Sequence, residues 1–300
     1  MSDLTSLRNP TTYEINPSLF LDQAIFLARV SEMAYEADPL YAESVLKVKG
    51  IQWFPSLDDL NATTKAIFFS QKDVSVLSFQ GSFSASDWAS NARFVTAPFL
   101  FEGWGNVHQG FYDSLLDCIP RLIPRFLESS GSGTIWLTGH SRGGAIAVLA
   151  AAYIKAKFDR AVNVMTYGQP MAATSVFCKM YNRYLNDSTF RFITQGDPVP
   201  SLPGVVYEHC GKPKKIKREA VLEGFASRGP GALSIDDEEA NPMDRTEASE
   251  LMDRLASGSV ELNQPGVDEG LFRRASGLFE PHKMVSYITG LESIKAAKES

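Results

Sequence analysis

The chain has 300 residues, of which 44% are hydrophobic and 21% are charged. That length allows one large α/β domain or two small ones, and the apolar content is enough for a substantial core. The formal net charge of −6 at pH 7 excludes a general positive field that would attract nucleic acid. We therefore expect a globular protein that has no nucleic-acid partner.

Neither a targeting segment nor a membrane span is predicted. Residues 1–17 are polar and lack a basic region followed by an apolar one, which a secretory signal requires. The most apolar run, residues 145–154, is shorter than the ~20 residues that cross a bilayer. We expect a cytoplasmic protein, with leaderless secretion left open.

The chain has three cysteines, Cys118, Cys178 and Cys210, which are widely spaced. An odd number at this spacing indicates neither a disulfide framework nor a metal site. We expect buried thiols in a reducing compartment.

The first third of the chain is predicted to contain two helices and three strands. Apolar spacing predicts an amphipathic helix over residues 18–36 and a short helix over 41–48. Strands are expected at residues 50–54, 65–70 and 74–79, and a hairpin-sized turn joins the last two.

The rest of the chain alternates between helical and strand patterns, which predicts a mostly parallel sheet covered by helices on both faces. Pro120 and Pro124 interrupt the first helical pattern, so we expect a kink or two short helices there. The expected elements are helix 112–127, strand 134–138, helix 145–158, strand 162–167, helix 172–185, strand 190–194 and a terminal helix that ends near residue 297.

The central motif is Gly-x-Ser-x-Gly, formed by Gly139, Ser141 and Gly143. It lies between a predicted strand and a predicted helix, as a nucleophile elbow requires. Such a turn is so tight that only very small residues fit two positions before and after the serine. It would place Ser141 at the N-terminal end of a helix, where the dipole favours negative charge. The same letters also occur in ordinary turns, so the prediction depends on finding a base and an acid.

Asp197 is the candidate acid because it follows a predicted strand, at the sheet edge where α/β folds bind ligands. The Gly-Asp-Pro around it is also an ordinary turn sequence. His282 is the candidate base, since it follows Asp197 on a loop that leads into the terminal helix. The order Ser141, Asp197, His282 is the order of an α/β-hydrolase. His209 also follows Asp197 and is the alternative base.

Two further segments have an open interpretation. Residues 83–107 carry Phe94, Phe99, Phe101 and Trp104 and could form either a mobile apolar flap or a packed loop. From residue 212 the composition changes, with a basic run followed by an acidic one, and we interpret residues 212–279 as a charged insertion. Its basic run is either a solvated face or a contact for an anionic lipid surface.

Several blocks of the sequence together resemble the class 3 lipases, the fungal-lipase-like branch of the α/β-hydrolases. They keep the order of that family between about residues 66 and 290. These blocks are residues 79–82 with Asp87 and Trp88, 107–111, 139–145, 166–170, 194–200, 207–211 and 281–287.

The resemblance implies a single α/β-hydrolase domain over residues 1–300 with Ser141 as nucleophile, His282 as general base and Asp197 as its orienting acid. It also implies an oxyanion hole formed by Ser82 and the backbone N–H of Arg142, and a lid within residues 83–106. No metal or organic cofactor is expected. The chain departs from the family at Arg142, where leucine is common, at Gln80 and Met171, where arginine is common, and in the length of the segment from residue 212 to 279.

The expected activity is hydrolysis of carboxylic esters of lipids through an acyl-enzyme on Ser141. The class is that of a triacylglycerol or monoacylglycerol lipase or a phospholipase A. The expected partners are the lipid or other ester substrate and, transiently, a membrane or lipid-droplet surface. The alternatives are an acyltransferase that uses the same acyl-enzyme and a non-catalytic scaffold or binding protein on a hydrolase fold.

Overall fold

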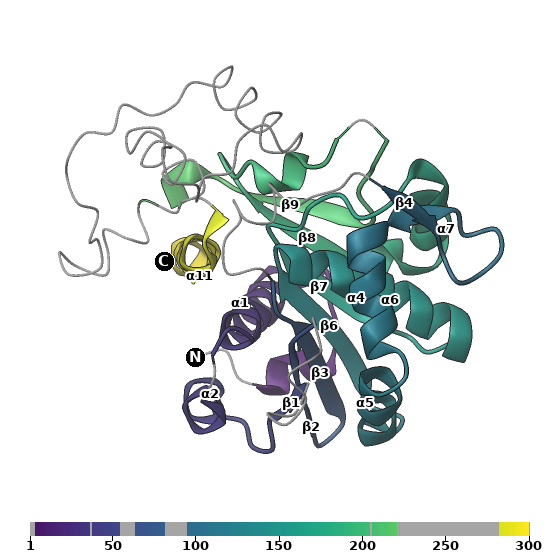
Figure 1. Cartoon of the computed structure of the whole chain (residues 1–300). Coiled ribbons are helices and arrows are strands. Elements are labelled where there is room, and N and C mark those ends of the chain that lie inside the picture. Colours follow the sequence, from purple (N-terminus) through teal and green to yellow (C-terminus); the bar gives the residue numbers. More distant parts are fainter. Residues whose placement is uncertain are drawn as a thin grey trace, which may run out of the picture.

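A computed structural model describes residues 4–36, 38–54, 64–81, 95–204, 206–220, 222 and 282–299. Within these residues, a seven-stranded sheet runs through the centre of the molecule (Figure 1). Its strands, in spatial order, are β1 (Gln52–Phe54), β2 (Ala66–Gln71), β3 (Val74–Phe79), β6 (Thr134–His140), β7 (Asn163–Tyr167), β8 (Thr189–Thr194) and β9 (Lys212–Ile216). The strands from β3 to β9 pair in parallel, whereas β1 and β2 add an antiparallel edge.

Helices cover both faces of this sheet, which is the arrangement that the sequence predicted for an α/β-hydrolase-type fold (Figure 1). One face carries α1 (Pro17–Met33), α2 (Pro39–Leu46) and α11 (Met284–Glu299), and the other carries α4 (Gln109–Cys118), α5 (Leu122–Ser130), α6 (Arg142–Phe158) and α7 (Ser175–Leu185). Short 3-10 helices accompany them: η1 (Leu4–Arg8), η2 (Asn186–Ser188) and η3 (Val199–Ser201). None of the described helices is both long and apolar enough to span a membrane.

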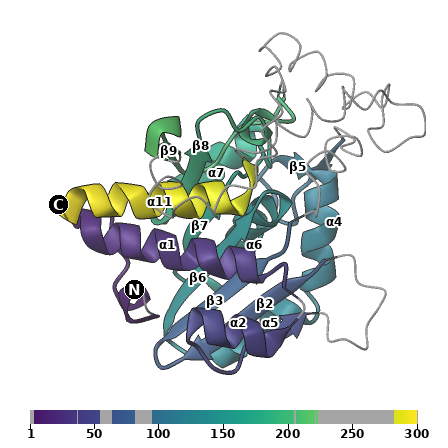
Figure 2. The same ribbon diagram turned by 90° about the vertical axis from the view of Figure 1, so that its left-hand side faces the viewer.

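The two ends of the chain lie together, because α1 and α11 pack side by side on the same face (Figure 2). Arg29 pairs with Glu292 at 2.6 Å, and Lys295 pairs with Asp22 at the same distance. The terminal helix, which follows His282, is therefore anchored to the N-terminal part of the fold.

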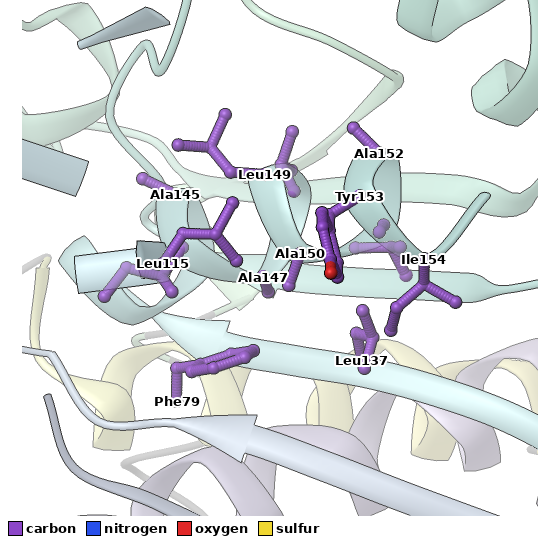
Figure 3. Packing of buried hydrophobic residues seen from close by; sticks show 14 of the residues in the cluster. Phe79, Leu115, Leu137, Ala145, Ala147, Leu149, Ala150, Ala152, Tyr153 and Ile154 are labelled. Carbon is purple, nitrogen blue, oxygen red and sulfur yellow. The ribbon is translucent and has the colours of Figure 1, made fainter. Parts of the chain in front are cut away.

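Strand periodicity divides the interior into two cores, one on each side of the sheet. In β6, Leu137 packs against α6, while Trp136 faces the core under α1. Helix α6 is buried along most of its length, and its many alanines allow it to lie close to the strands (Figure 3). This central packing fixes the position of the residue at the start of α6.

The predicted interruption by prolines produces two helices, α4 and α5. Pro120 lies between them, and Pro124 occupies the first turn of α5, where a missing N–H removes no helical hydrogen bond.

Residues 95–108 form a packed hairpin of two strands, β4 (Thr96–Pro98) and β5 (Asn106–His108). Phe99 and Trp104 are only 6% and 7% exposed, and both rings contact Phe177 of α7. This part of the predicted flap is thus a packed loop rather than a solvent-exposed one. Residues 83–94 of the candidate lid and the oxyanion candidate Ser82 lie outside the described residues.

Strand β9 was not predicted, because a lysine-rich run is typical of a solvated surface. It forms the edge of the sheet beside β8, and a charged edge strand discourages pairing with another chain. Lys214 binds Glu14 and Lys212 binds Asp187, at 2.7 and 2.6 Å. The segment interpreted as an insertion from residue 212 therefore begins with a strand of the central sheet, and its residues 223–279 lie outside the described part.

Candidate active site

The elbow is formed where β6 ends at His140 and α6 begins at Arg142. Ser141 lies between them with φ 54° and ψ −129°, a backbone conformation that is strained for a residue with a side chain. A Cβ at Gly139 would lie 2.4 Å from the carbonyl carbon of Gly143, and one at Gly143 would lie 2.0 Å from the Phe79 oxygen. These contacts are the physical reason for glycine on both sides of the serine.

The Ser141 hydroxyl is buried and makes no hydrogen bond with any described residue. Its backbone N–H donates to the Tyr167 carbonyl at 2.9 Å, which ties the turn to β7. The end of β3 passes close by, since a Cβ at Gly81 would lie 3.3 Å from the Ser141 Cβ. The serine oxygen is thus held at the positive end of α6 without a partner of its own among these residues.

Asp197 and His282 form a buried pair next to this turn. Asp197 follows β8 and His282 precedes α11, and His282 Nδ1 lies 2.8 Å from Asp197 Oδ2. Asp197 Oδ1 accepts the backbone N–H of Val199 at 2.9 Å, which fixes the carboxylate plane. His282 Nε2 is buried and has no hydrogen-bond partner among the described residues. With Nδ1–H directed at the carboxylate, a neutral His282 ring keeps a lone pair on Nε2.

Tyr287 of α11 adds a third donor to the carboxylate, because its hydroxyl binds Asp197 Oδ2. Burial and the neighbouring Asp197 raise the pKa of Tyr287 well above its ordinary value, so the hydroxyl remains protonated and donates. The sequence placed this residue in a family block but gave it no role.

Gly168 makes room for the Asp197–His282 pair. It follows β7 with φ +58°, and a Cβ there would lie 2.7 Å from His282 Nδ1 and 2.9 Å from Asp197 Oδ2. Sequence reasoning missed this requirement, although a glycine directly after a strand was a usable signal.

His140 connects the elbow to His282. Its Nε2 lies 2.6 Å from the His282 carbonyl oxygen, and its Nδ1 lies 2.9 Å from the Tyr35 hydroxyl. Burial, with His282 nearby, holds the pKa of His140 well below its ordinary value, so the ring is neutral. Because a carbonyl only accepts, Nε2 carries the proton and Nδ1 accepts from Tyr35. No feature of the sequence pointed to Tyr35.

The other histidines lie away from Asp197. His209 Nε2 binds the Pro200 carbonyl oxygen at 2.7 Å, and burial together with Arg191 lowers the pKa of His209 to about 4. His108 stacks on Phe111, and burial lowers its pKa to about 4. All four histidines are described, and His282 is the one that contacts Asp197.

Arg142 contributes the first backbone amide of α6, while its side chain points to α4. The guanidinium donates to Ser114 Oγ, and burial lowers its pKa from the ordinary arginine value. Within the described ranges, no group of three or more histidine, cysteine, aspartate or glutamate side chains could hold a metal ion.

Comparison with known protein families agrees with this geometry. Residues 76–207, which contain the elbow and Asp197, match the family model described as Lipase (class 3). Over these residues the chain is similar to the class 3 lipases.

Relatives of the chain are named as lipid-hydrolysing enzymes. The chloroplastic phospholipase A(1) DAD1 of Arabidopsis thaliana is 30% identical over 160 residues, which are 46% of this chain and 35% of that protein. The secreted mono- and diacylglycerol lipase A of Penicillium cyclopium is 32% identical over 132 residues, 43% of this chain and 42% of that protein. The chain thus matches less than half the length of either relative.

Solved lipase structures share the fold. The Rhizomucor miehei lipase in its propeptide complex has a TM-score of 0.56 and 22% identity, covering 69% of this chain and 70% of that one. A mutant of MDLA from Penicillium cyclopium has a TM-score of 0.56 and 23% identity, covering 69% of this chain and 82% of that one.

Proposed function

We propose that this chain hydrolyses carboxylic esters of lipids through an acyl-enzyme on Ser141. The observation that carries the proposal is the buried Asp197–His282 pair, which lies beside a strained serine elbow and whose outer nitrogen has no partner among the described residues. The class 3 lipase segment and the names of the relatives support a lipid ester as substrate.

In this mechanism Ser141 attacks the ester carbonyl while His282 Nε2 accepts the hydroxyl proton. The Asp197 carboxylate orients the ring and stabilises the imidazolium that forms. His282 then gives the proton to the departing alcohol. A water molecule then attacks the acyl-enzyme in the same way, with His282 Nε2 accepting its proton, and the acid is released as that proton returns to Ser141.

We place the oxyanion at the start of α6, where the Arg142 N–H and Ser82 would stabilise its charge. Each donor of this kind lowers the barrier by about 3 kcal/mol. The positive φ at Ser141 serves this arrangement, because it forms the tight turn that joins β6 to α6, whose first backbone N–H is that of Arg142.

The relatives are named as a phospholipase A(1) and as mono- and diacylglycerol lipases. We therefore propose acylglycerols or phospholipids as the substrate class. Contact with a membrane or lipid-droplet surface and a cytoplasmic location stay predictions from the sequence.

The test is hydrolysis of p-nitrophenyl esters from acetate to palmitate, with and without detergent micelles, by the intact protein and by Ser141→Ala. Ser130→Ala is the matched control, since Ser130 is also buried and its hydroxyl donates to the Leu127 carbonyl within α5. The proposal predicts activity that is lost in Ser141→Ala and kept in Ser130→Ala. Equal activity of the intact protein and Ser141→Ala would overturn it.

A further inference from the structure

Two buried thiols lie in contact at a place that the proposed reaction does not use. Cys178 is on α7 and Cys210 directly precedes Gly211 and β9, with their Sγ atoms 2.9 Å apart. Both side chains are almost fully buried, at 2% and 1% exposure. The third cysteine, Cys118, instead donates to the Ser114 carbonyl within α4.

Other contacts hold the two backbones together at this point. Asn182, one helical turn after Cys178 on the same face of α7, accepts the Gly211 N–H at 2.8 Å. Gly211 has φ +77° and packs so tightly that a Cβ would lie 2.3 Å from a Thr189 methyl carbon. Tyr181 binds the Thr189 hydroxyl at 2.8 Å. These contacts keep the two backbones close, and the sulfurs, 2.9 Å apart, need to approach to the ~2.05 Å of a disulfide bond.

A buried cation accompanies the thiols. Arg191 of β8 is 6% exposed, and its Nε and Nη1 atoms have no hydrogen-bond partner among the described residues. Burial lowers the pKa of Arg191 to about 10, and the two cysteines act against this change. A guanidinium beside a thiol favours the thiolate, which is the form that attacks a disulfide. Burial acts in the opposite direction by raising the pKa of Cys210, so this thiol stays protonated once the chain is folded.

We propose that Cys178 and Cys210 form a disulfide when the chain folds in the presence of a disulfide oxidant. With oxidised glutathione, one cysteine thiolate attacks a glutathione sulfur and releases one glutathione. The second cysteine thiolate then attacks the mixed disulfide at the protein sulfur and releases the other glutathione. The two thiols lose two protons and two electrons, and one oxidised glutathione becomes two reduced molecules.

This bond would brace the segment that carries Asp197. The cysteines are 32 positions apart, and the enclosed segment contains β8 and the Asp197 turn. Closing a loop of this length restricts the unfolded chain and so stabilises the fold. For Cys178 and Cys210, this inference replaces the expectation of reduced thiols. It does not depend on the proposed ester hydrolysis.

The experiment refolds the intact chain with oxidised glutathione, alkylates free thiols in denaturant with iodoacetamide, and maps the peptides by mass. We expect one alkylated residue, Cys118, and a linked peptide that contains Cys178 and Cys210. After reduction, all three cysteines should be alkylated. Alkylation of all three before reduction, or a linkage that includes Cys118, would overturn the proposal.

Melting temperature gives a second measurement. The oxidised protein should melt about 5–10 °C above the same protein with reductant. That difference should persist in Cys118→Ser and vanish in Cys178→Ser and Cys210→Ser. An equal difference in all three variants would contradict the assignment. If the buried substitutions prevent folding, the peptide map of the unaltered chain decides the question.

Discussion

His282 and His209 follow the same aspartate in the chain and bind oxygen atoms at nearly equal distances, yet they have different neighbours. His282 Nδ1 lies 2.8 Å from a carboxylate oxygen of Asp197, and His209 Nε2 lies 2.7 Å from the neutral carbonyl oxygen of Pro200. The carboxylate can stabilise a proton gained by its ring, whereas burial and Arg191 hold the pKa of His209 at about 4. The charge on the partner, more than the hydrogen bond itself, therefore distinguishes the proposed base from the structural histidine.

Replacement of each ring by alanine gives the largest expected difference. His282→Ala should reduce kcat by about 10⁴-fold or more, because Ser141 then has no base. His209→Ala should keep kcat within about tenfold and lose stability instead, because the Pro200 carbonyl loses its donor. The assay is ester hydrolysis, with circular dichroism to verify folding. An active His282→Ala beside a folded, inactive His209→Ala would reverse the assignment.

Gly168→Ala tests the space around the acid–base pair. The added methyl group would collide with both His282 and Asp197, so we expect kcat to fall about 100-fold or more. Gly50→Ala is the matched control, since Gly50 has φ +74° and a Cβ there meets no atom within 4 Å. It carries the same backbone strain and should retain full activity. Similar kcat values for the two variants would show that the pair tolerates displacement.

The fold and the elbow were predictable because their causes are local. Residues 74–79 alternate between the two faces of the sheet, and β3 has those bounds. The glycines around Ser141 are required by contacts within a few residues or with the adjacent strand. His282 could be preferred over His209 because it lies on a loop that leads into the terminal helix, and only four histidines had to be considered.

The remaining features depend on contacts between distant residues. The Tyr35 hydroxyl binds His140 Nδ1, although the two residues are 105 positions apart in the chain. No local sequence pattern predicts such a contact. The lysines of β9 suggested a solvated surface, although their strand pairs with β8. The sequence left open whether Phe99 and Trp104 belong to a mobile flap or a packed loop, because α7, which contacts both rings, follows much later in the chain.

Tyr287→Phe should give a smaller effect than the changes above. It removes one donor from Asp197 and leaves the bonds from His282 and Val199, so we expect kcat to fall about tenfold with KM unchanged. Tyr181→Phe removes an equally buried hydroxyl that binds Thr189, and it should alter stability without altering kcat. A KM change, or the same kcat loss in both variants, would contradict a positioning role for Tyr287.

The smallest predicted effect concerns acid stability. The pKa of His108 is about 4 in the folded state and about 6.5 in the unfolded chain, so only the unfolded chain gains a proton as the pH falls from 6.5 to 4. Stability should therefore decrease on acidification, by up to about 2 kcal/mol between pH 7 and 5 from His108, and His209, whose pKa is also about 4, should act in the same direction. His108→Phe keeps a ring against Phe111 and should flatten the dependence in urea unfolding at several pH values. An unchanged dependence of the unfolding free energy on pH in His108→Phe would show that groups other than His108 cause the loss of stability in acid.

The central claim is that the Asp197–His282 pair activates Ser141. The most direct test is the rate at which a serine-directed p-nitrophenyl phosphonate labels the protein, followed by intact mass and peptide mapping. We predict one label, on the peptide that contains Ser141, formed at similar rates in the intact protein and His209→Ala and far more slowly in His282→Ala. Labelling of His282→Ala at the rate of the intact protein, or no label on Ser141, would contradict the claim.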